Sequence, residues 1–114
     1  MISGIGIDIV DISRFKLFAE DKIFLAKYFS ESEVQLGIES MAGRFAAKEA
    51  FLKAVKNRYL LNWDDIEIIK KPDGSPDFKL KNTAAKFVEN RYIHLSISHS
   101  SDLAIALVII ESKI

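Results

Sequence analysis

The stretch from Gly43 to Ala54 constrains the fold most, because it favours a helix yet carries charges around its whole circumference. A helix that lies on a protein surface gathers its charges on one face. Here the charged residues are interleaved with a large apolar side and with a small-residue side; they are Arg44, Lys48, Glu49 and Lys53. We therefore expect a long central helix that packs on most of its sides. A surface helix with one Glu49–Lys53 pair, four residues apart, is the alternative.

Residues 2–10 alternate with a period of two and are rich in isoleucine, which predicts a β-strand. Gly4, Gly6 and Asp8 share one face of this strand. Glycine weakens a strand, so two glycines on one face indicate either a close approach to the backbone or a bulge. Asp8 lies between isoleucines, and a partly buried carboxylate there needs a partner or a metal ion.

Periodicity and turn signals predict the other elements. In the first half of the chain these are a helix from near Arg14 to Phe29 with a break near Asp21, capped by Asp11 or Ser13, then a short helix that starts at a Ser30–Glu33 capping box and ends at Gly37, and then the central helix from near Ser40. In the second half they are strands at 66–69 and 76–80 around a turn at 72–75, a helix capped by Asn82 that runs to about Arg91, and strands at 93–99 and 103–111. The last strand is apolar on both faces, so we expect both faces to be covered, one of them by another subunit.

Length and composition limit the function classes. The 114 residues predict one domain, 1–114, and sixteen basic and sixteen acidic residues cancel, which gives no argument for nucleic acid or membrane partners. There is no cysteine, which excludes a disulfide scaffold and a thiolate metal site and fits a reducing compartment. No basic segment marks a signal peptide, and the longest apolar run, 103–110, is too short to span a bilayer. We expect a soluble, cytoplasmic protein.

Two carboxylates, Asp8 on the first strand and Glu49 on the central helix, stand among apolar neighbours. Two oxygen ligands with open positions for water and phosphate suit Mg²⁺. The cations Arg44, Lys48 and Lys53 could then hold phosphate oxygens. A divalent ion with cations around a phosphate is typical of phosphoryl transfer. The glycine motifs of the common nucleotide-binding folds are absent.

His99 ends a predicted strand between two serines. Its side chain could be structural, or it could hold a phosphate. Ser98 and His99 do not indicate a hydrolase triad, because no G-x-S-x-G motif and no orienting acid can be assigned.

Three blocks of sequence, taken in their order along the chain, indicate a known family. Gly4–Val10 is followed by Arg14 and Phe15, then by Arg44–Phe51, then by His94–His99. From residue 2 to about residue 110 the chain resembles the short bacterial holo-[acyl-carrier-protein] synthase group of the 4′-phosphopantetheinyl transferase family. The resemblance implies a single compact α+β domain whose antiparallel sheet packs against a long central helix.

The resemblance also implies the reaction. A transferase of this family moves 4′-phosphopantetheine from coenzyme A to a serine of apo acyl carrier protein, releases adenosine 3′,5′-bisphosphate and needs Mg²⁺, as a step that serves fatty acid biosynthesis. The short bacterial enzymes are homotrimers with active sites at subunit interfaces, so the resemblance implies a homotrimer here.

Residue roles follow from the same match. Asp8 and Glu49 correspond to the family's metal-binding acids, and together with Lys53, which the family places near the phosphates, they form the expected catalytic set. The resemblance does not decide whether a carboxylate or a water deprotonates the carrier serine.

Coenzyme A binding is implied for Arg44, Lys48, Lys53 and His99. Arg14 and the basic helix after it correspond to the face that docks the acidic carrier protein.

One segment departs from the family pattern. Where the family has a turn of the type Lys-Ala-x-Gly-Thr-Gly, this chain reads Lys-Ala-Val-Lys-Asn-Arg-Tyr from Lys53 to Tyr59. We expect altered nucleotide contacts across residues 55–62, where Lys56 and Arg58 could compensate.

Two other functions fit parts of the pattern. A Mg²⁺-dependent nucleotide phosphohydrolase would use water in place of the serine, and it would turn over without a carrier protein. A non-catalytic carrier-protein-binding module would keep its role when Asp8 is replaced.

Overall fold

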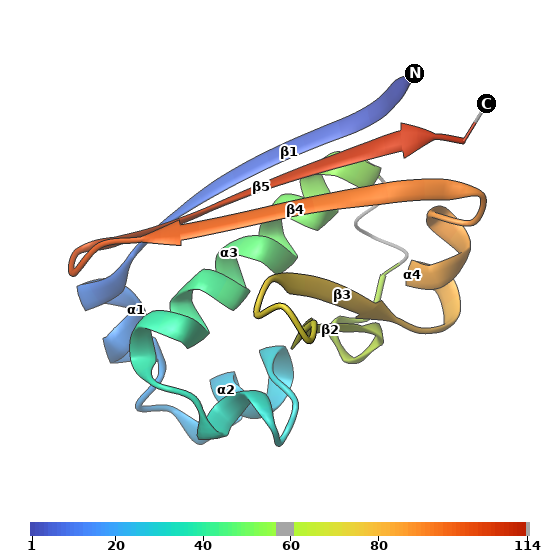
Figure 1. Ribbon diagram of the computed structural model, residues 1–114. Coiled ribbons are helices and arrows are strands. Elements are labelled where there is room, and N and C mark those ends of the chain that lie inside the picture. Colours follow the sequence, from blue (N-terminus) through green and yellow to red (C-terminus); the bar gives the residue numbers. More distant parts are fainter. Residues whose placement is uncertain (57–60, 114) are drawn as a thin grey trace.

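A long central helix lies against one face of a three-stranded antiparallel sheet in the computed structural model, which describes residues 1–56 and 61–113 (Figure 1). The elements are β1 (Ile2–Asp11), α1 (Ile12–Phe18), α2 (Lys22–Tyr28), η1 (Glu33–Gln35), α3 (Ile38–Val55), η3 (Trp63–Asp65), β2 (Ile66–Lys70), β3 (Pro76–Leu80), α4 (Asn82–Phe87), β4 (Arg91–His99) and β5 (Leu103–Ser112). This single compact α+β domain confirms the predicted fold class.

The sheet has the strand order β1-β5-β4, and β2 and β3 form a separate hairpin. Helix α3 lies between them, with the sheet on one side and the hairpin on another, while α1 and α2 sit near its N-terminal end (Figure 1). Ala104, Ala106, Val108 and Ile110 of β5 are buried within the cores that α3 shares. The central helix is therefore covered on most sides, as its scattered charges predict.

The contact between β1 and α3 is unusually close. A Cβ atom built on Gly4 would overlap the carbonyl oxygen of Ala54, and one built on Gly6 would overlap that of Ala50. Only glycine fits at these two positions, because the obstacle is helix backbone and cannot rotate away. Of the two alternatives for these glycines, the structure shows the close approach. A register shift also occurs between Ile2 and Gly4, so an irregularity is present at the start of the strand as well.

The other face of the sheet is open in the single chain. Ile5, Ile7 and Ile9 of β1 are each more than half exposed, and alternate residues of β5 on this face are only half-buried. The expectation that both faces of the last strand are covered thus holds for one face only within this chain.

The helix boundaries agree with the sequence in the first half of the chain. Asp11 caps α1 by accepting the backbone N–H of Arg14, and Asp21 caps α2 after the predicted break. The Ser30–Glu33 capping box forms, because Glu33 Oε1 accepts the Ser30 N–H at 2.9 Å. It leads into one 3₁₀ turn only, and α3 already begins at Ile38 with Gly37 as its N-cap.

The helix predicted from Asn82 to Arg91 is shorter than expected. It ends at Phe87, and Asn90 takes a left-handed conformation with φ 61° that turns the chain into β4. Asn82 is not its cap. Lys81 is the N-cap, and the Asn82 amide donates to Asp65 at 2.9 Å. Among the helices of the described residues, none is long and apolar enough to cross a membrane.

Gly6→Ala should lower the free energy of unfolding by about 3 kcal/mol or more, because its methyl group would meet the Ala50 carbonyl. Urea denaturation measures this change. Gly37→Ala is the control: nothing lies within 4 Å of its Cβ position, and we expect a loss below about 1 kcal/mol. Wild-type stability of Gly6→Ala would show that the close approach does not constrain the fold.

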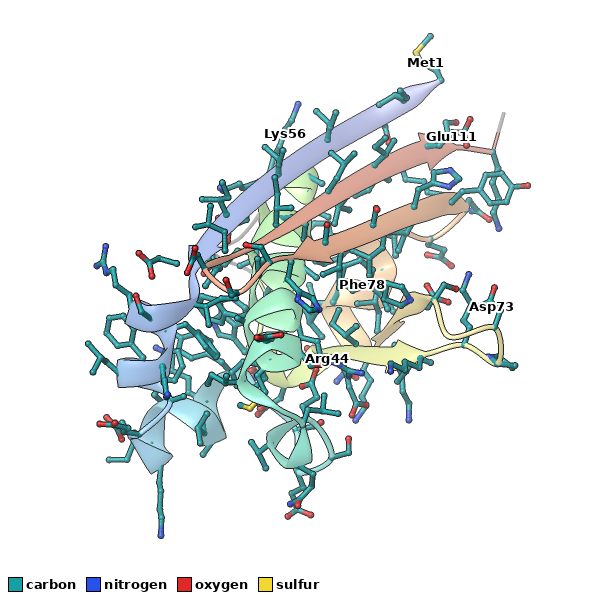
Figure 2. The ribbon with its side chains drawn as sticks, turned by 60° about the vertical axis from the view of Figure 1, so that its left-hand side comes forward. Met1, Arg44, Lys56, Asp73, Phe78 and Glu111 are labelled. Carbon is teal, nitrogen blue, oxygen red and sulfur yellow. The ribbon has the colours of Figure 1, made fainter. Side chains whose placement is uncertain are left out.

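Lys56 follows α3 in a left-handed conformation with φ 64° (labelled in Figure 2). That conformation costs a residue with a Cβ about 1–2 kcal/mol, while glycine adopts it freely at a smaller entropic cost. We expect Lys56→Gly to stabilise the fold by about 1 kcal/mol, measured by thermal denaturation, and Lys56→Ala to give no such gain. A destabilised Lys56→Gly variant would contradict this explanation.

Candidate active site

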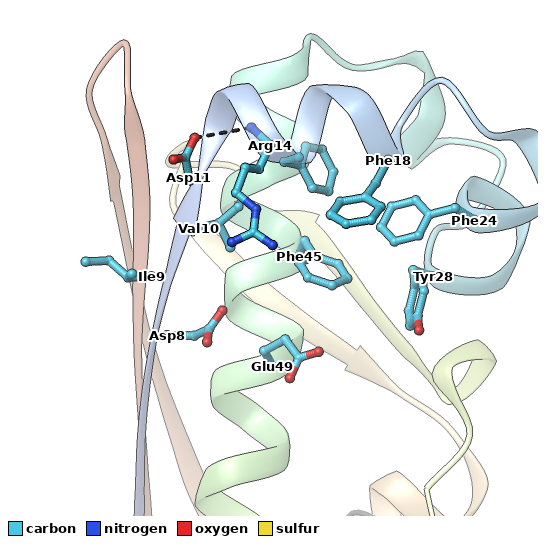
Figure 3. Close-up of a pocket in the computed structure, with 11 residues that line it drawn as sticks. Asp8, Ile9, Val10, Asp11, Arg14, Phe18, Phe24, Tyr28, Phe45 and Glu49 are labelled. Atoms are coloured by element: carbon cyan, nitrogen blue, oxygen red, sulfur yellow. Dashed lines mark hydrogen bonds between the residues drawn. The ribbon is translucent and has the colours of Figure 1, made fainter.

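Asp8 and Glu49 line one pocket of about 530 Å³ between β1, α1 and α3. Asp8 stands on β1 two residues after Gly6, and Glu49 precedes Ala50 on α3. Since Gly6 touches the Ala50 carbonyl, the close contact between strand and helix sets both acids side by side. Figure 3 shows the two carboxylates pointing into the same space, with the Arg14 side chain above them.

Lys53 extends this group along α3, one turn beyond Glu49. Its Nζ lies 3.0 Å from Asp8 Oδ1 and donates to the Ile7 carbonyl oxygen at 2.9 Å. The Asp8 side chain is 17% exposed and that of Lys53 is 46% exposed. The structure therefore brings the three residues of the expected catalytic set together.

The two carboxylates suit a hard divalent cation. They come from separate rigid elements and open onto the same solvent-accessible pocket. Within residues 1–56 and 61–113 no group of three or more acidic, histidine or cysteine side chains could hold a metal ion. Asp8 and Glu49 could contribute two oxygen ligands and leave the other positions to water and substrate, which is an arrangement that suits Mg²⁺.

The far wall of the pocket is aromatic, and the sequence alone did not predict it. Its rings belong to α1, α2 and α3; they are Phe15, Phe18, Phe24, Tyr28 and Phe45. Many of these rings contact one another, with Phe15–Phe45 at 5.6 Å and Tyr28–Phe45 at 5.4 Å between centroids. The position of Phe45, four residues before Glu49 and so on the same side of the helix, is the signal that could have found this wall.

Arg14 lies near the start of α1 on the pocket rim, and its side chain is exposed. Its backbone N–H donates to Asp11 Oδ1 at 3.2 Å, which fixes the helix start. The Ser13 hydroxyl and this N–H hold the pKa of Asp11 below its usual range.

Arg44 and His99 lie in a second pocket of about 240 Å³ and do not line the first. The Arg44 guanidinium donates to the Ile68 carbonyl oxygen on the side of α3 that faces the β2–β3 hairpin (Figure 2). His99 Nδ1 is 3.5 Å from Glu39 Oε2. Within one chain, these two predicted coenzyme A contacts are thus separate from Asp8 and Glu49.

The prediction that Lys48 contacts coenzyme A does not fit this structure. Its side chain is 1% exposed, and Nζ donates to Glu33 Oε1 at 2.6 Å and to the Tyr28 carbonyl oxygen at 2.7 Å. Burial lowers the pKa of Lys48, and the hydrogen bond and charge of Glu33 oppose that shift. The reason for the error is that the partner of Lys48 is an acid from another element, so the ammonium faces the core.

Glu33 does more than cap a helix, and the sequence alone did not predict its second role. Its side chain is wholly buried. It accepts hydrogen bonds from the Lys48 ammonium, from the Ser30 N–H and, at 3.2 Å, from the Ile68 N–H. A capping box predicts only the Ser30 contact. The altered turn expected to change nucleotide contacts falls partly on residues 57–60, which lie outside the described residues.

Comparison with known proteins extends this picture. The model of the 4′-phosphopantetheinyl transferase superfamily matches residues 4–108. A holo-[acyl-carrier-protein] synthase of Clavibacter michiganensis is 40% identical, covering 97% of both chains, and one of Leifsonia xyli is 38% identical, covering 97% of this chain and 98% of the relative.

Solved structures of similar proteins match the fold of this chain over nearly its full length. A Bacillus anthracis holo-(acyl-carrier-protein) synthase in complex with coenzyme A (3′,5′-ADP) matches with a TM-score of 0.82 and 35% identity over 98% of both chains. A Helicobacter pylori holo-[acyl-carrier-protein] synthase in complex with coenzyme A has a TM-score of 0.82 and 34% identity over 94% of this chain and 99% of that one. With sequence and fold matched along nearly its full length, the chain belongs to the 4′-phosphopantetheinyl transferase superfamily, in the group of the holo-[acyl-carrier-protein] synthases.

Proposed function

We propose that this protein transfers 4′-phosphopantetheine from coenzyme A to a serine of apo acyl carrier protein and releases adenosine 3′,5′-bisphosphate, a step that serves fatty acid biosynthesis. The observation that carries the proposal is the meeting of Asp8 and Glu49 in one pocket, with Lys53 beside Asp8. Relatives named as holo-[acyl-carrier-protein] synthases, and similar structures in complex with coenzyme A, support it.

The chemistry follows from the charges around the pocket. The serine hydroxyl oxygen attacks the phosphorus that carries pantetheine, and the bond from that phosphorus to the bridging oxygen of the anhydride breaks. Mg²⁺ held by Asp8 and Glu49 would neutralise negative charge on the diphosphate. The Lys53 ammonium stabilises the departing phosphate. The serine proton passes to a carboxylate of the pair or to an ordered water, and the variants described below distinguish the two.

Coenzyme A binding by Arg44 and His99 requires a second subunit in this proposal. Both residues line the second pocket, together with Lys70, so cations gather there away from Asp8. The apolar outer face of the sheet, with the exposed Ile5, Ile7 and Ile9, supports self-association. We propose a homotrimer in which the second pocket of one subunit adjoins the acid pair of its neighbour and binds the nucleotide.

The carrier protein docks on α1 in this proposal. Arg14 and Lys16 are exposed on that helix, and its apolar residues Leu17 and Phe18 are 67% and 52% exposed. A mixed cationic and apolar face at the rim of the pocket fits an acidic partner that must bring a serine to Asp8 and Glu49. The lack of cysteine is compatible with the cytoplasmic location that we propose.

The reaction is tested by mass spectrometry of apo acyl carrier protein after incubation with this protein, coenzyme A and Mg²⁺. We expect the carrier mass to rise by one phosphopantetheine group, and adenosine 3′,5′-bisphosphate to form only when the carrier is present. Nucleotide release without carrier would instead support a phosphohydrolase, and an unmodified carrier would refute the transferase.

Asp8→Asn and Glu49→Gln should each lower kcat by about 100-fold or more, because each removes a charged oxygen from the acid pair. Initial rates at increasing Mg²⁺, and pH–rate profiles, are the measurement. A variant that stays slow at saturating Mg²⁺ has lost the base, and one that Mg²⁺ fully restores has lost only a metal ligand. If Mg²⁺ fully restores both variants, neither carboxylate is the base and an ordered water takes the serine proton. Glu89→Gln, on an exposed residue outside the pocket, should behave as wild type. Unchanged rates in both variants would contradict the assignment.

Arg14→Glu should raise KM for the carrier protein by about tenfold and leave KM for coenzyme A nearly unchanged, because the reversed charge repels an acidic partner. Steady-state kinetics with each substrate varied in turn measure both constants. Lys86→Glu on α4 makes the same charge change on an exposed residue away from the pocket and serves as the control. Equal effects of the two substitutions would contradict docking at α1.

A further inference from the structure

Glu33 and Lys48 are the charged residues that the structure buries among the residues it describes, and no step of the proposed reaction uses them. Glu33 Oε1 accepts from Lys48 Nζ at 2.6 Å and from the Ser30 N–H at 2.9 Å. Glu33 Oε2 accepts from the Ile68 N–H at 3.2 Å. Removing one charge of such a pair leaves its partner buried and uncompensated, so loss of either residue should disturb the groups bonded to the other.

Lys48 connects this pair to the first pocket. Its ammonium also bonds the carbonyl oxygen of Tyr28, the last residue of α2, and lies 4.9 Å from the centre of the Phe29 ring. The Tyr28 ring is 4.9 Å from Phe24, and both rings line the pocket that Glu49 faces. Lys48 therefore fixes the end of the helix that supplies this part of the aromatic wall.

Arg44 connects the same pair to the second pocket. Its Nη1 lies 3.7 Å from Glu33 Oε2, and it donates to the carbonyl oxygen of Ile68. Ile68 is thus held twice, since its N–H donates to Glu33 while its carbonyl accepts from Arg44. Arg44, whose side chain is 12% exposed, lines the second pocket together with His99.

We propose that Glu33 is a positioning residue for both pockets: through Lys48 it places the Tyr28 end of α2 over the Asp8–Glu49 pocket, and directly it orients Arg44 in the second pocket. Glu33 touches no substrate in this role. The kinetic part of the proposal rests on the proposed transferase function, and the positional part does not.

Trp63, the single tryptophan, reports on the position of α2. Its ring lies 4.6 Å from that of Tyr28 and 6.2 Å from that of Phe45, between centroids. A shift of the α2 end should therefore change Trp63 emission, whereas a change at Asp8 should not.

The test compares Glu33→Gln, Lys48→Met and the double variant with Glu31→Gln, a matched control on an exposed neighbour. Glutamine keeps the size of Glu33 but cannot offer two acceptor oxygens to three donors. The double variant removes both charges and guards against unfolding of the single variants. All assays are run at a temperature where circular dichroism shows a folded protein.

We expect a changed Trp63 emission and a loss of about tenfold or more in kcat/KM for coenzyme A in the folded Glu33 and Lys48 variants, and neither change in Glu31→Gln. Asp8→Asn should lose activity with unchanged emission. Folded variants with wild-type kcat, KM and Trp63 emission would overturn the proposal. If the wild-type protein lacks transferase activity, Trp63 emission alone decides the positional part, and unchanged emission overturns it.

Discussion

The contact between the β1 glycines and the backbone of α3 is the constraint on which the site depends. Gly6 lies against the Ala50 carbonyl and Gly4 against that of Ala54, so strand and helix touch without side chains between them. The residues next to this contact are those of the proposed acid pair. Asp8 follows Gly6 on the same face of the strand, and Glu49 precedes Ala50 on the helix. A larger residue at either glycine would separate the two acids.

The charged side chains of α3 face two different parts of the protein. Glu49 lines the first pocket, and Lys53 contacts Asp8 of β1. Arg44 and Lys48 turn instead to Glu33, and Arg44 also bonds Ile68 of the β2–β3 hairpin. A helix between a sheet and a hairpin has little free surface, which explains why its charges do not form one solvated face. Lys48 is therefore part of the buried scaffold, whereas Arg44 both bonds the scaffold and lines the second pocket.

Local patterns in the sequence predicted the strands and the central helix, because each depends on periodicity within one element. The pairing of Asp8 with Glu49 joins two elements, and what indicated it was the chemistry of two carboxylates among apolar neighbours, with two glycines beside Asp8. The destination of Lys48 could not be predicted in this way. Its partner Glu33 lies fifteen residues earlier and satisfies a capping box, so nothing local indicates a buried ion pair. The separation of Arg44 and His99 from the acid pair is likewise tertiary, since the hairpin and β4 bring those two residues to another pocket. The specific reaction was predicted from the family resemblance. The residue pattern alone indicated phosphoryl transfer only as one possibility, beside purely structural roles for the same residues.

We propose that Asp8 and Glu49, placed by the glycine contact, bind one divalent ion together. Electron paramagnetic resonance of Mn²⁺, used in place of Mg²⁺ with saturating coenzyme A, measures this directly through the loss of the free-ion signal. We predict one bound Mn²⁺ per chain in the wild-type protein, and binding at least about tenfold weaker after either Asp8→Asn or Glu49→Gln. Wild-type Mn²⁺ affinity in either variant would contradict a shared site.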